Sequence, residues 1–499
     1  MSRKKKVIKN ILSEIMPQLF IMILGLIRSK YYLQYLGGDT VGLVNLFNQI
    51  VGYLSLVEGG LGQAVIYKLC KPTKENDYLL IAKIRNGVQS IFRKIIIIIT
   101  ILAVIGGFII PFLIKDNQYS TTYILVNFLL YAISEIILYA TVFERSIYVA
   151  SEKSFKINYV IKTSLIMKYF LQILLAILFQ NITLIFIVLI LVGLIENIII
   201  KFMAQKDYND LPKTTEQDRS ILHEVKNLLV HKIGGLVATN IDIILISKFI
   251  GLGKVLIYST YLMYQNALVS LTSKISKAMV GTVGNILLED RKKAHDAFIK
   301  FNGIAFFVAI IVGGPFNLFI NYFIEIFYNG KVETSIVTSL LFTIILIYSI
   351  IRIPLITYSE GAGLFKETRI CPIIESIVNF ILSIILVNVI GINGCLVGTI
   401  VSLIISEYFI KPHILYKKLF DNKVNEYYLV NIKFVFLLFL QISITYALSY
   451  YMVISNMILL IAYLIIYVII ELVFMLIIFK ILKQDYIFDI FGLLRKRRS

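Results

Sequence analysis

The pattern of apolar and polar positions between residues 9 and 71 predicts a hairpin of two membrane helices. The first apolar span runs from Asn10 to Leu33, and its polar, charged or conformationally special residues are separated by steps of 4, 3, 8 and 3 residues. On a helix these steps place all of them on one face. A second span, at about 40 to 62, repeats the arrangement. The residues on these two faces are Asn10, Glu14, Pro17, Gly25 and Arg28, then Asn45, Gln49, Gly52, Gly59 and Gln63.

The polar pattern of the first span returns 217 residues later. At that offset Asn10 corresponds to Asn227, and Gly25 corresponds to Asp242. The span that follows again carries polar and small residues on one face: Asn266, Ser270, Ser273, Lys277, Gly281 and Gly284. We infer two six-helix halves that enter the membrane from the same side and are parallel repeats, with chance similarity of short spacings as the alternative.

Stretches of about 20 mostly apolar residues, the length that spans a bilayer as a helix, occur about fourteen times. Hydrophobic residues make up 58% of the chain and charged residues only 16%, which excludes an ordinary soluble protein. Uninterrupted apolar runs within these stretches exclude a membrane barrel, whose strands alternate. The predicted fold class is an all-α integral membrane protein. The stretches centre near residues 22, 51, 103, 131, 168, 193, 237, 270, 312, 346, 380, 404, 440 and 469.

The repeat and the polar connections predict the domain organisation. We expect an N-terminal six-helix lobe at 1–204, a cytoplasmic linker at 205–220 and a C-terminal six-helix lobe at 221–420. An extra helix pair and a basic cytoplasmic tail occupy 421–499.

The net charge of +19 has a topological explanation. Lys and Arg concentrate in alternate connections and at both termini, as the positive-inside rule requires when both termini are cytoplasmic. This placement argues against a nucleic-acid partner. We expect a multi-pass protein of the cytoplasmic membrane, surrounded by lipid and monomeric.

Chemical motifs that would indicate an enzyme are missing from the sequence. There is no G-x-x-x-x-G-K-[ST] phosphate loop, and the four histidines and three cysteines are scattered without metal-ligand or redox spacing. No long connection on the outer side offers room for a catalytic domain. We therefore expect a transporter with no catalytic residues, no cofactor and no metal.

Three cations within the predicted spans are candidates for binding an anionic substrate, because buried charges in membranes usually face a cavity or a partner. Arg28 has snorkelling to the interface as its alternative. Lys277 shares a face with small polar residues, which suits a wetted wall. Arg352 lies two residues before Pro354, where a kink is expected, and pairing with Glu375 is its alternative. The polar residues Gln49 and Asn266 complete the predicted substrate-binding set.

Acidic residues within the spans are candidates for ion coupling or gating. Asp242 lies about 22 Å along its helix from Asn227, which is still within the hydrocarbon, and a structural interhelix pair is its alternative. Glu135 is placed to pair with Lys168, and Glu196 is a further buried acid. We expect Glu58, Glu135 and Asp242 to be the coupling or gating residues.

The run from Glu58 to Pro72, EGGLGQAVIYKLCKP, resembles the end of the second helix in Wzx-type polysaccharide flippases. These flippases belong to the multidrug/oligosaccharidyl-lipid/polysaccharide (MOP) exporter superfamily. The run from Asn240 to Gly251, NIDIILISKFIG, is similar to the second half of that family. Cys70 departs from the aliphatic or aromatic residue expected at its position.

The resemblance implies a flippase of the bacterial inner membrane that works by alternating access between two lobes. Its substrate would be a polyprenyl-diphosphate-linked oligosaccharide for O-antigen or capsule synthesis, and a polysaccharide polymerase is the expected partner. Only the Glu58 segment and Asp242 occupy matching motif positions. An ion-coupled antiporter of small molecules, like the multidrug and toxic compound extrusion (MATE) transporters of the same superfamily, is the alternative.

Overall fold

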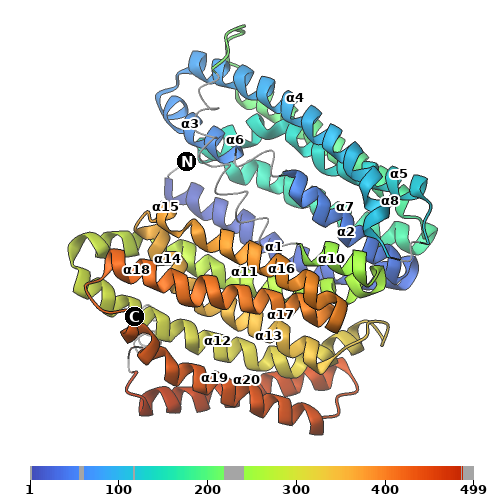
Figure 1. Cartoon of the computed structure of the whole chain (residues 1–499). Coiled ribbons are helices and arrows are strands. Elements are labelled where there is room, and N and C mark those ends of the chain that lie inside the picture. Colours follow the sequence, from blue (N-terminus) through green and yellow to red (C-terminus); the bar gives the residue numbers. More distant parts are fainter. Residues whose placement is uncertain (1–2, 56–60, 116–117, 219–240, 485, 487–499) are drawn as a thin grey trace. The chain divides into compact units, whose positions relative to one another are not determined.

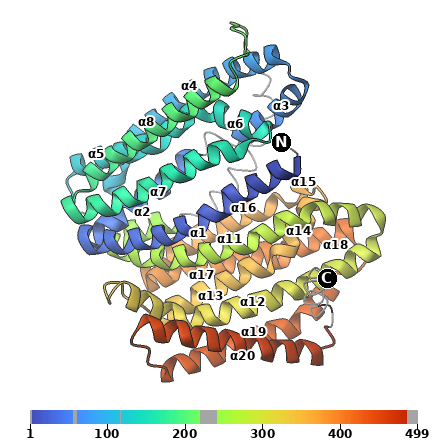
Figure 2. The same ribbon diagram turned by 180° about the vertical axis from the view of Figure 1, so that it is seen from behind.

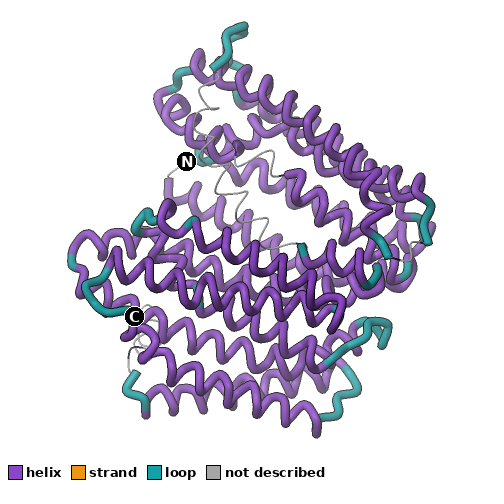
Figure 3. Tube along the Cα trace, viewed as in Figure 1, coloured by secondary structure: helices purple, strands orange, loops and turns teal. Residues whose placement is uncertain are grey.

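The computed structural model describes residues 3–55, 61–115, 118–218, 241–484 and 486. Within these residues the ordered elements are all helices, joined by short turns (Figure 3). The predicted all-α class is therefore confirmed. The chain forms two compact units, residues 1–256 and 257–499, which are described separately below.

Unit 1 is built from eight long or short α-helices before residue 219, together with α10 and the start of α11. Two short 3₁₀ segments, η2 (Ile110–Leu113) and η3 (Ile137–Thr141), follow α4 and α5. The helices are α1 (Arg3–Leu36), α2 (Gly38–Leu54), α3 (Leu61–Glu75), α4 (Tyr78–Ile109), α5 (Thr121–Ile136), α6 (Val142–Ala150), α7 (Ser154–Phe179), α8 (Ile182–Asp207) and α10 (Asp242–Phe249).

Unit 2 contains most of α11 (Leu252–Glu289) and all later helices. A π-helical segment, η4 (Ile404–Ile410), joins α17 to α18. The other helices are α12 (Arg291–Phe327), α13 (Ile336–Ile351), α14 (Ile353–Gly361), α15 (Phe365–Thr368), α16 (Ile370–Ile390), α17 (Ile392–Leu403), α18 (Lys411–Leu419), α19 (Asn425–Tyr451) and α20 (Met457–Ile481).

Ten helical segments among the described residues are long and apolar enough to cross a membrane. They account for ten of the predicted spans. The stretches near residues 22, 51 and 270 lie in α1, α2 and α11, which are not among these ten segments. The stretch near residue 237 lies outside the described residues.

Side chains at the helix starts fix several boundaries. Asp77 accepts a hydrogen bond from the Leu80 amide at 2.9 Å, and so caps α4. Asp290 and Asn456 cap α12 and α20 in the same way. Such caps satisfy backbone donors that have no partner within the helix.

Helix α12 is the centre of unit 2. In its most apolar window 72% of residues are buried, against 11% for α20. It packs against α13, α19 and α20, and runs between α13 and α19 in Figure 1. A helix that is apolar all round is expected in such a central position.

The last two helices, which the sequence places outside the repeat, join unit 2 through polar contacts in an apolar interface. The Asn317 amide donates to the Thr445 hydroxyl at 2.7 Å, and the Tyr322 hydroxyl donates to the Met452 carbonyl at 2.7 Å. Asn302 donates to Asn431 deeper along the same seam. In a bilayer, where the hydrophobic effect does not drive helix association, such contacts hold helices together.

Helices α16 and α17 form a tight hairpin that depends on glycine. A Cβ added at Gly394 would collide with the Leu386 backbone and would lie 2.7 Å from the Val387 nitrogen. A Cβ at Gly398 would lie 3.0 Å from the Ser383 nitrogen. The small-xxx-small spacing therefore has its ordinary meaning, which is close packing.

We expect Gly394→Ala to destabilise unit 2 by about 1 to 3 kcal/mol, because a backbone contact cannot yield as a side chain can. The control is Gly281→Ala, since a Cβ there meets nothing within 4 Å. Thermal unfolding of both variants in detergent measures the difference. Equal melting temperatures for the two variants would contradict this account of the hairpin.

Candidate functional site

The polar stripe of the first helix lies against α7, and Figure 2 shows the two helices side by side. The Asn10 amide donates to the Glu152 carbonyl at 3.3 Å and accepts from the Phe155 amide at 2.9 Å. Gly25 faces Tyr169, with the ring atom Cε2 3.7 Å from an added Cβ. These members of the predicted stripe thus serve helix–helix contact.

Arg28 continues that stripe and is held by side chains of α1 and α7. Its guanidinium donates to the Gln172 side-chain oxygen at 3.2 Å and lies 4.8 Å from the centre of the Tyr169 ring. The Tyr32 hydroxyl donates to the same Gln172 oxygen at 2.8 Å. Arg28 therefore has protein partners, including a cation–π contact, and does not depend on snorkelling.

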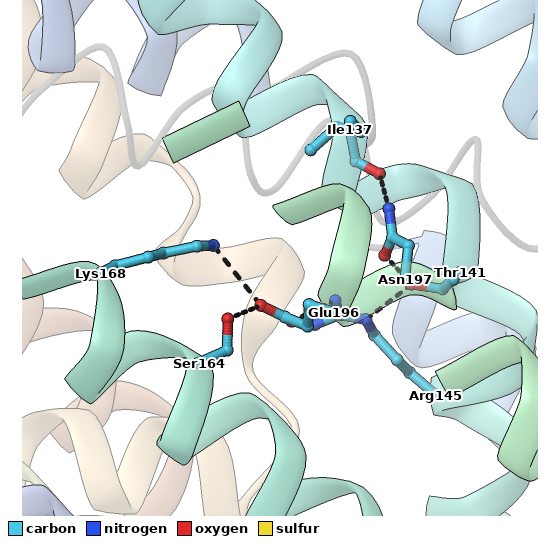
Figure 4. Close-up of polar contacts among 7 residues, drawn as sticks. All are labelled: Ile137, Thr141, Arg145, Ser164, Lys168, Glu196 and Asn197. Atoms are coloured by element: carbon cyan, nitrogen blue, oxygen red, sulfur yellow. Dashed lines mark hydrogen bonds and ion pairs between the residues drawn. The ribbon is translucent and has the colours of Figure 1, made fainter. Parts of the chain in front are cut away.

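Glu196 on α8 is the centre of a buried ionic cluster in unit 1 (Figure 4). Its side chain is 3% exposed, and one carboxylate oxygen accepts from Arg145 at 2.7 Å. The other accepts from the Ser164 hydroxyl at 2.6 Å and forms an ion pair with Lys168 at 3.4 Å. Lys168 and Ser164 approach from one side and Arg145 from the other. Two cations and a hydroxyl thus compensate one buried carboxylate.

Asn197, beside Glu196, supplies hydrogen-bond partners to the helix break between α5 and α6. Its amide donates to the Ile137 carbonyl at 2.6 Å, and its oxygen accepts from the Thr141 hydroxyl at 2.8 Å. The tighter 3₁₀ winding of η3 leaves backbone groups that need such partners inside a membrane. The break and the ionic cluster are therefore one connected polar structure.

Glu135 extends the cluster towards α1. Its side chain is exposed, and it interacts electrostatically with Lys168 and Glu196. Among the described residues, Lys168 forms its ion pair within 4.0 Å with Glu196. The sequence predicted Glu135 as its partner. The Tyr131 hydroxyl, which donates to Asn48 at 3.2 Å, lies in the electrostatic range of both Glu135 and Arg28. A track of polar groups therefore runs through unit 1 from Arg28 to Arg145.

Two other predicted residues, Gln49 and Asp242, meet through Tyr53. Gln49 on α2 hydrogen-bonds the Tyr53 hydroxyl, which also interacts electrostatically with Asp242 on α10. Asp242 is buried, and α10 packs against α2 and η2. The start of the predicted second lobe thus contacts the first helical hairpin within unit 1.

In unit 2, Arg352 lies where α13 ends and α14 begins, just before Pro354. It interacts electrostatically with Glu375 and Glu407. Glu407 forms a buried ion pair with Lys411 at 2.8 Å. Arg352 is therefore part of a cluster of two acids and two bases, which is close to the pairing alternative considered from the sequence.

The exposed polar face of α11 is the remaining candidate. Asn266, Ser270 and Lys274 are all exposed and follow at intervals of four residues, so they share one face. The side chain of Lys277 and the whole of Glu58 lie outside the described residues. Of the predicted binding residues, Asn266 is thus the one that is clearly accessible.

Arg145, Gln172 and Glu407 are site residues that sequence reasoning missed. Arg145 carried a usable signal, since it is a charge within an otherwise apolar stretch. Gln172 lies four residues after Lys168, on the same helix face, and this spacing is the signal that would have found it.

Comparison with solved structures identifies the fold. A lipid II flippase MurJ in an inward closed conformation aligns with a TM-score of 0.70 and 17% identity, over 95% of this chain and 99% of that one. An inward-facing multidrug resistance MATE transporter of the MOP superfamily aligns with a TM-score of 0.58 and 14% identity, over 82% of this chain and 99% of that one. The sequence matches no protein-family model and no curated protein sequence.

The chain therefore has the fold of these aligned proteins, a lipid II flippase and a multidrug transporter of the MOP superfamily. The aligned structures are those of a flippase and multidrug transporters. It is a multi-pass membrane protein.

Proposed function

We propose that this chain is a Wzx-type flippase. It would move polyprenyl-diphosphate-linked oligosaccharides from the cytoplasmic to the outer face of the bacterial inner membrane, for O-antigen or capsule synthesis. The observation that carries the proposal is the likeness to a lipid II flippase over 95% of the chain. The MATE transporter aligns with only 82% of the chain.

The task of a flippase explains the polar groups in the spans. A charged glycan head must cross an apolar slab while its polyprenyl tail stays in lipid, so the protein needs a wet, charged path. The exposed face of α11 and the track from Arg28 to Arg145 supply polar groups at membrane depth. We assign Arg28, Gln49, Asn266, Lys277 and Arg352 to substrate binding, and Glu58, Glu135 and Asp242 to coupling or gating.

An apolar groove between α19 and α20 suits the lipid tail. Its volume is about 290 Å³, and its lining is apolar apart from Gln441, Glu471 and the hydroxyl of Tyr467. Because the tail stays in the hydrocarbon, a chain of isoprene units in this groove would exchange lipid contacts for close packing against these side chains. The groove is compatible with a lipid-linked substrate.

The alternative is an ion-coupled, MATE-like antiporter. The TM-scores of 0.58 and 0.53 for inward-facing and outward-facing MATE structures favour it as the second candidate. Under either function we place both termini in the cytoplasm, with lobes at 1–204 and 221–420 joined by the 205–220 linker. For the flippase we expect a monomer, with a polysaccharide polymerase as partner.

Purified protein in vesicles tests the proposal. Lys274 is exposed on the same face of α11 as the assigned residue Asn266, and we therefore expect Lys274→Ala to slow the flipping of a fluorescent polyprenyl-diphosphate glycan about tenfold, because a charge-assisted contact to the diphosphate is lost. Lys293→Ala removes the same charge at an exposed position at the start of α12, and should leave the rate unchanged.

Each outcome decides between the candidates. Flipping in vesicles that contain the wild-type protein, and not in protein-free vesicles, supports the flippase. No flipping, together with gradient-driven movement of an organic cation, would replace it with the antiporter. Equal rates for Lys274→Ala and Lys293→Ala would remove the α11 face from the substrate path.

A further inference from the structure

Unit 1 carries a basic pocket that the transport proposal does not use. It has a volume of about 530 Å³ and lies between α4, α6, α8 and the segment after α8. Its cationic lining residues are Arg85, Lys201 and Lys213, and Gln89, Tyr208 and Asn209 add polar groups. The pocket therefore presents hydrogen-bond donors and positive charge in one concave place.

A second cavity of about 320 Å³ adjoins the basic pocket, since both are lined by Gln89, Phe143, Glu144 and Lys201. This cavity continues along α4, where Val88, Phe92 and Ile96 supply an apolar wall. Arg93 lies at its edge. The two cavities together form a polar mouth that leads into an apolar slot.

The cations of this double cavity are not neutralised by ion pairs. Arg85, Arg93, Lys201 and Lys213 have no carboxylate within 4.0 Å in the part of the chain that the structure describes. One acid, Glu144, faces the cavity and interacts electrostatically with Arg85 and Lys201. Four cations against one carboxylate leave an excess of positive charge.

Neighbouring lysines behave differently. Lys83, also on α4, pairs with Glu216 at 2.5 Å, and Lys68 pairs with Asp218 at 2.7 Å. Acids are thus available on the adjoining segment, yet they pair outside the cavity. This contrast leaves the cations of the cavity without a close carboxylate among the described residues.

The Tyr208 side chain lines the polar mouth of the double cavity. Burial raises the pKa of Tyr208, so the phenol keeps its proton near neutral pH. It already shares a hydrogen bond with Ser151 at 2.7 Å, which fixes its position. Because the Ser151 hydroxyl donates to the Tyr148 carbonyl, the Tyr208 proton is used in the bond to Ser151, and the neutral phenol adds polarity to the mouth beside the three cations.

The surface around the cavity is apolar and exposed. On α8, Ile198 and Phe202 flank Lys201 and are 66% and 67% exposed. On α4, Ile97 lies one turn beyond Arg93 and is 59% exposed. Such surfaces face lipid in a membrane protein, so a lipid can reach the cavity from the side.

We propose that this double cavity binds an anionic phospholipid, with its phosphate among Arg85, Lys201 and Lys213 and an acyl chain in the slot beside Val88, Phe92 and Ile96. Basic pockets between membrane helices near a charged interface commonly hold lipid phosphates. The site is independent of the transported substrate. A soluble phosphate compound carries the same charged group as the lipid head. It has no acyl chain to occupy the slot, so binding in the slot distinguishes the two ligands.

Native mass spectrometry of the full chain in neutral detergent tests the site. Phosphatidylglycerol and phosphatidylcholine with identical acyl chains are titrated against the wild type and against the double variant Arg85→Gln/Lys201→Gln. We expect phosphatidylglycerol to bind the wild type at least about tenfold more tightly than it binds the variant, because two charge contacts are lost. Phosphatidylcholine binding should not change.

Two further variants separate the possible outcomes. Lys292→Gln/Lys293→Gln removes two exposed charges in unit 2. An equal loss of phosphatidylglycerol affinity in this variant would mean that only the net charge of the protein matters, and would overturn the site. Ala140→Phe fills the slot without touching the cations, and should weaken phosphatidylglycerol but not glycerol phosphate. If glycerol phosphate binds as tightly as phosphatidylglycerol to both the wild type and Ala140→Phe, the proposal that the ligand is a lipid is wrong. Ala140→Phe and the single variant Lys201→Gln keep the test valid if the double variant does not fold.

Discussion

Replacing Glu196 by alanine is expected to destabilise unit 1 by about 3 to 5 kcal/mol, because two largely buried cations lose their compensating carboxylate. Arg145 and Lys168 both pair with Glu196, at 2.7 and 3.4 Å, and their side chains are only 22% and 14% exposed. Thermal unfolding of the purified protein in detergent, together with the yield of folded protein, measures the loss.

The exposed pair of Lys83 and Glu216 provides the control. Its members are 30% and 66% exposed, so Glu216→Ala should cost about 1 kcal/mol or less. The triple variant Arg145→Met/Lys168→Met/Glu196→Leu should recover most of the stability, since it removes every buried charge. If the triple variant melts no higher than Glu196→Ala, the ionic account of the cluster is wrong.

Lys411→Met should have an effect of similar size in unit 2. The lysine contacts both oxygens of Glu407 at 2.8 Å, and the two side chains are 10% and 5% exposed. Its loss leaves Glu407 buried beside Glu375, with only the longer-range influence of Arg352 to offset two negative charges. We expect a loss of about 3 to 5 kcal/mol, measured by thermal unfolding.

The double variant Glu407→Gln/Lys411→Met is the matched test. It removes both charges and keeps the volume, so it should be more stable than Lys411→Met alone. Lys418→Met, which breaks a half-exposed pair with Glu367, should change the melting temperature little. A double variant less stable than the single one would indicate that packing, and not charge, explains the loss.

Helix positions followed directly from the sequence, because a bilayer-length apolar run leaves the backbone no alternative to a helix. The kink at Arg352 and Pro354 was also predictable, since proline blocks a helical hydrogen bond locally. Such features depend on residues close together in the chain.

Pairings between helices were not predictable. Arg145 and Glu196 are 51 residues apart, and nothing in their spacing distinguishes this pair from others such as Glu135 and Lys168. Similarly, the polar face of α1 carries Arg28, which was predicted to bind substrate, but spacing alone cannot say whether such a face meets water or a neighbouring segment, as Asn10 meets Glu152 and Phe155. The three-dimensional structure is needed to distinguish a polar face that meets water from one that meets protein.

The polar seam between α12 and α19 has a mechanical consequence. Hydrogen bonds at three levels, near Asn302, Asn317 and Tyr322, fasten α19 along α12, and α20 packs against α12 as well. Breaking this seam would expose several polar groups to lipid at once. If unit 2 moves as a rigid body, the α19–α20 groove therefore moves with it. Under the flippase proposal, a tail lying in that groove would travel with the moving lobe.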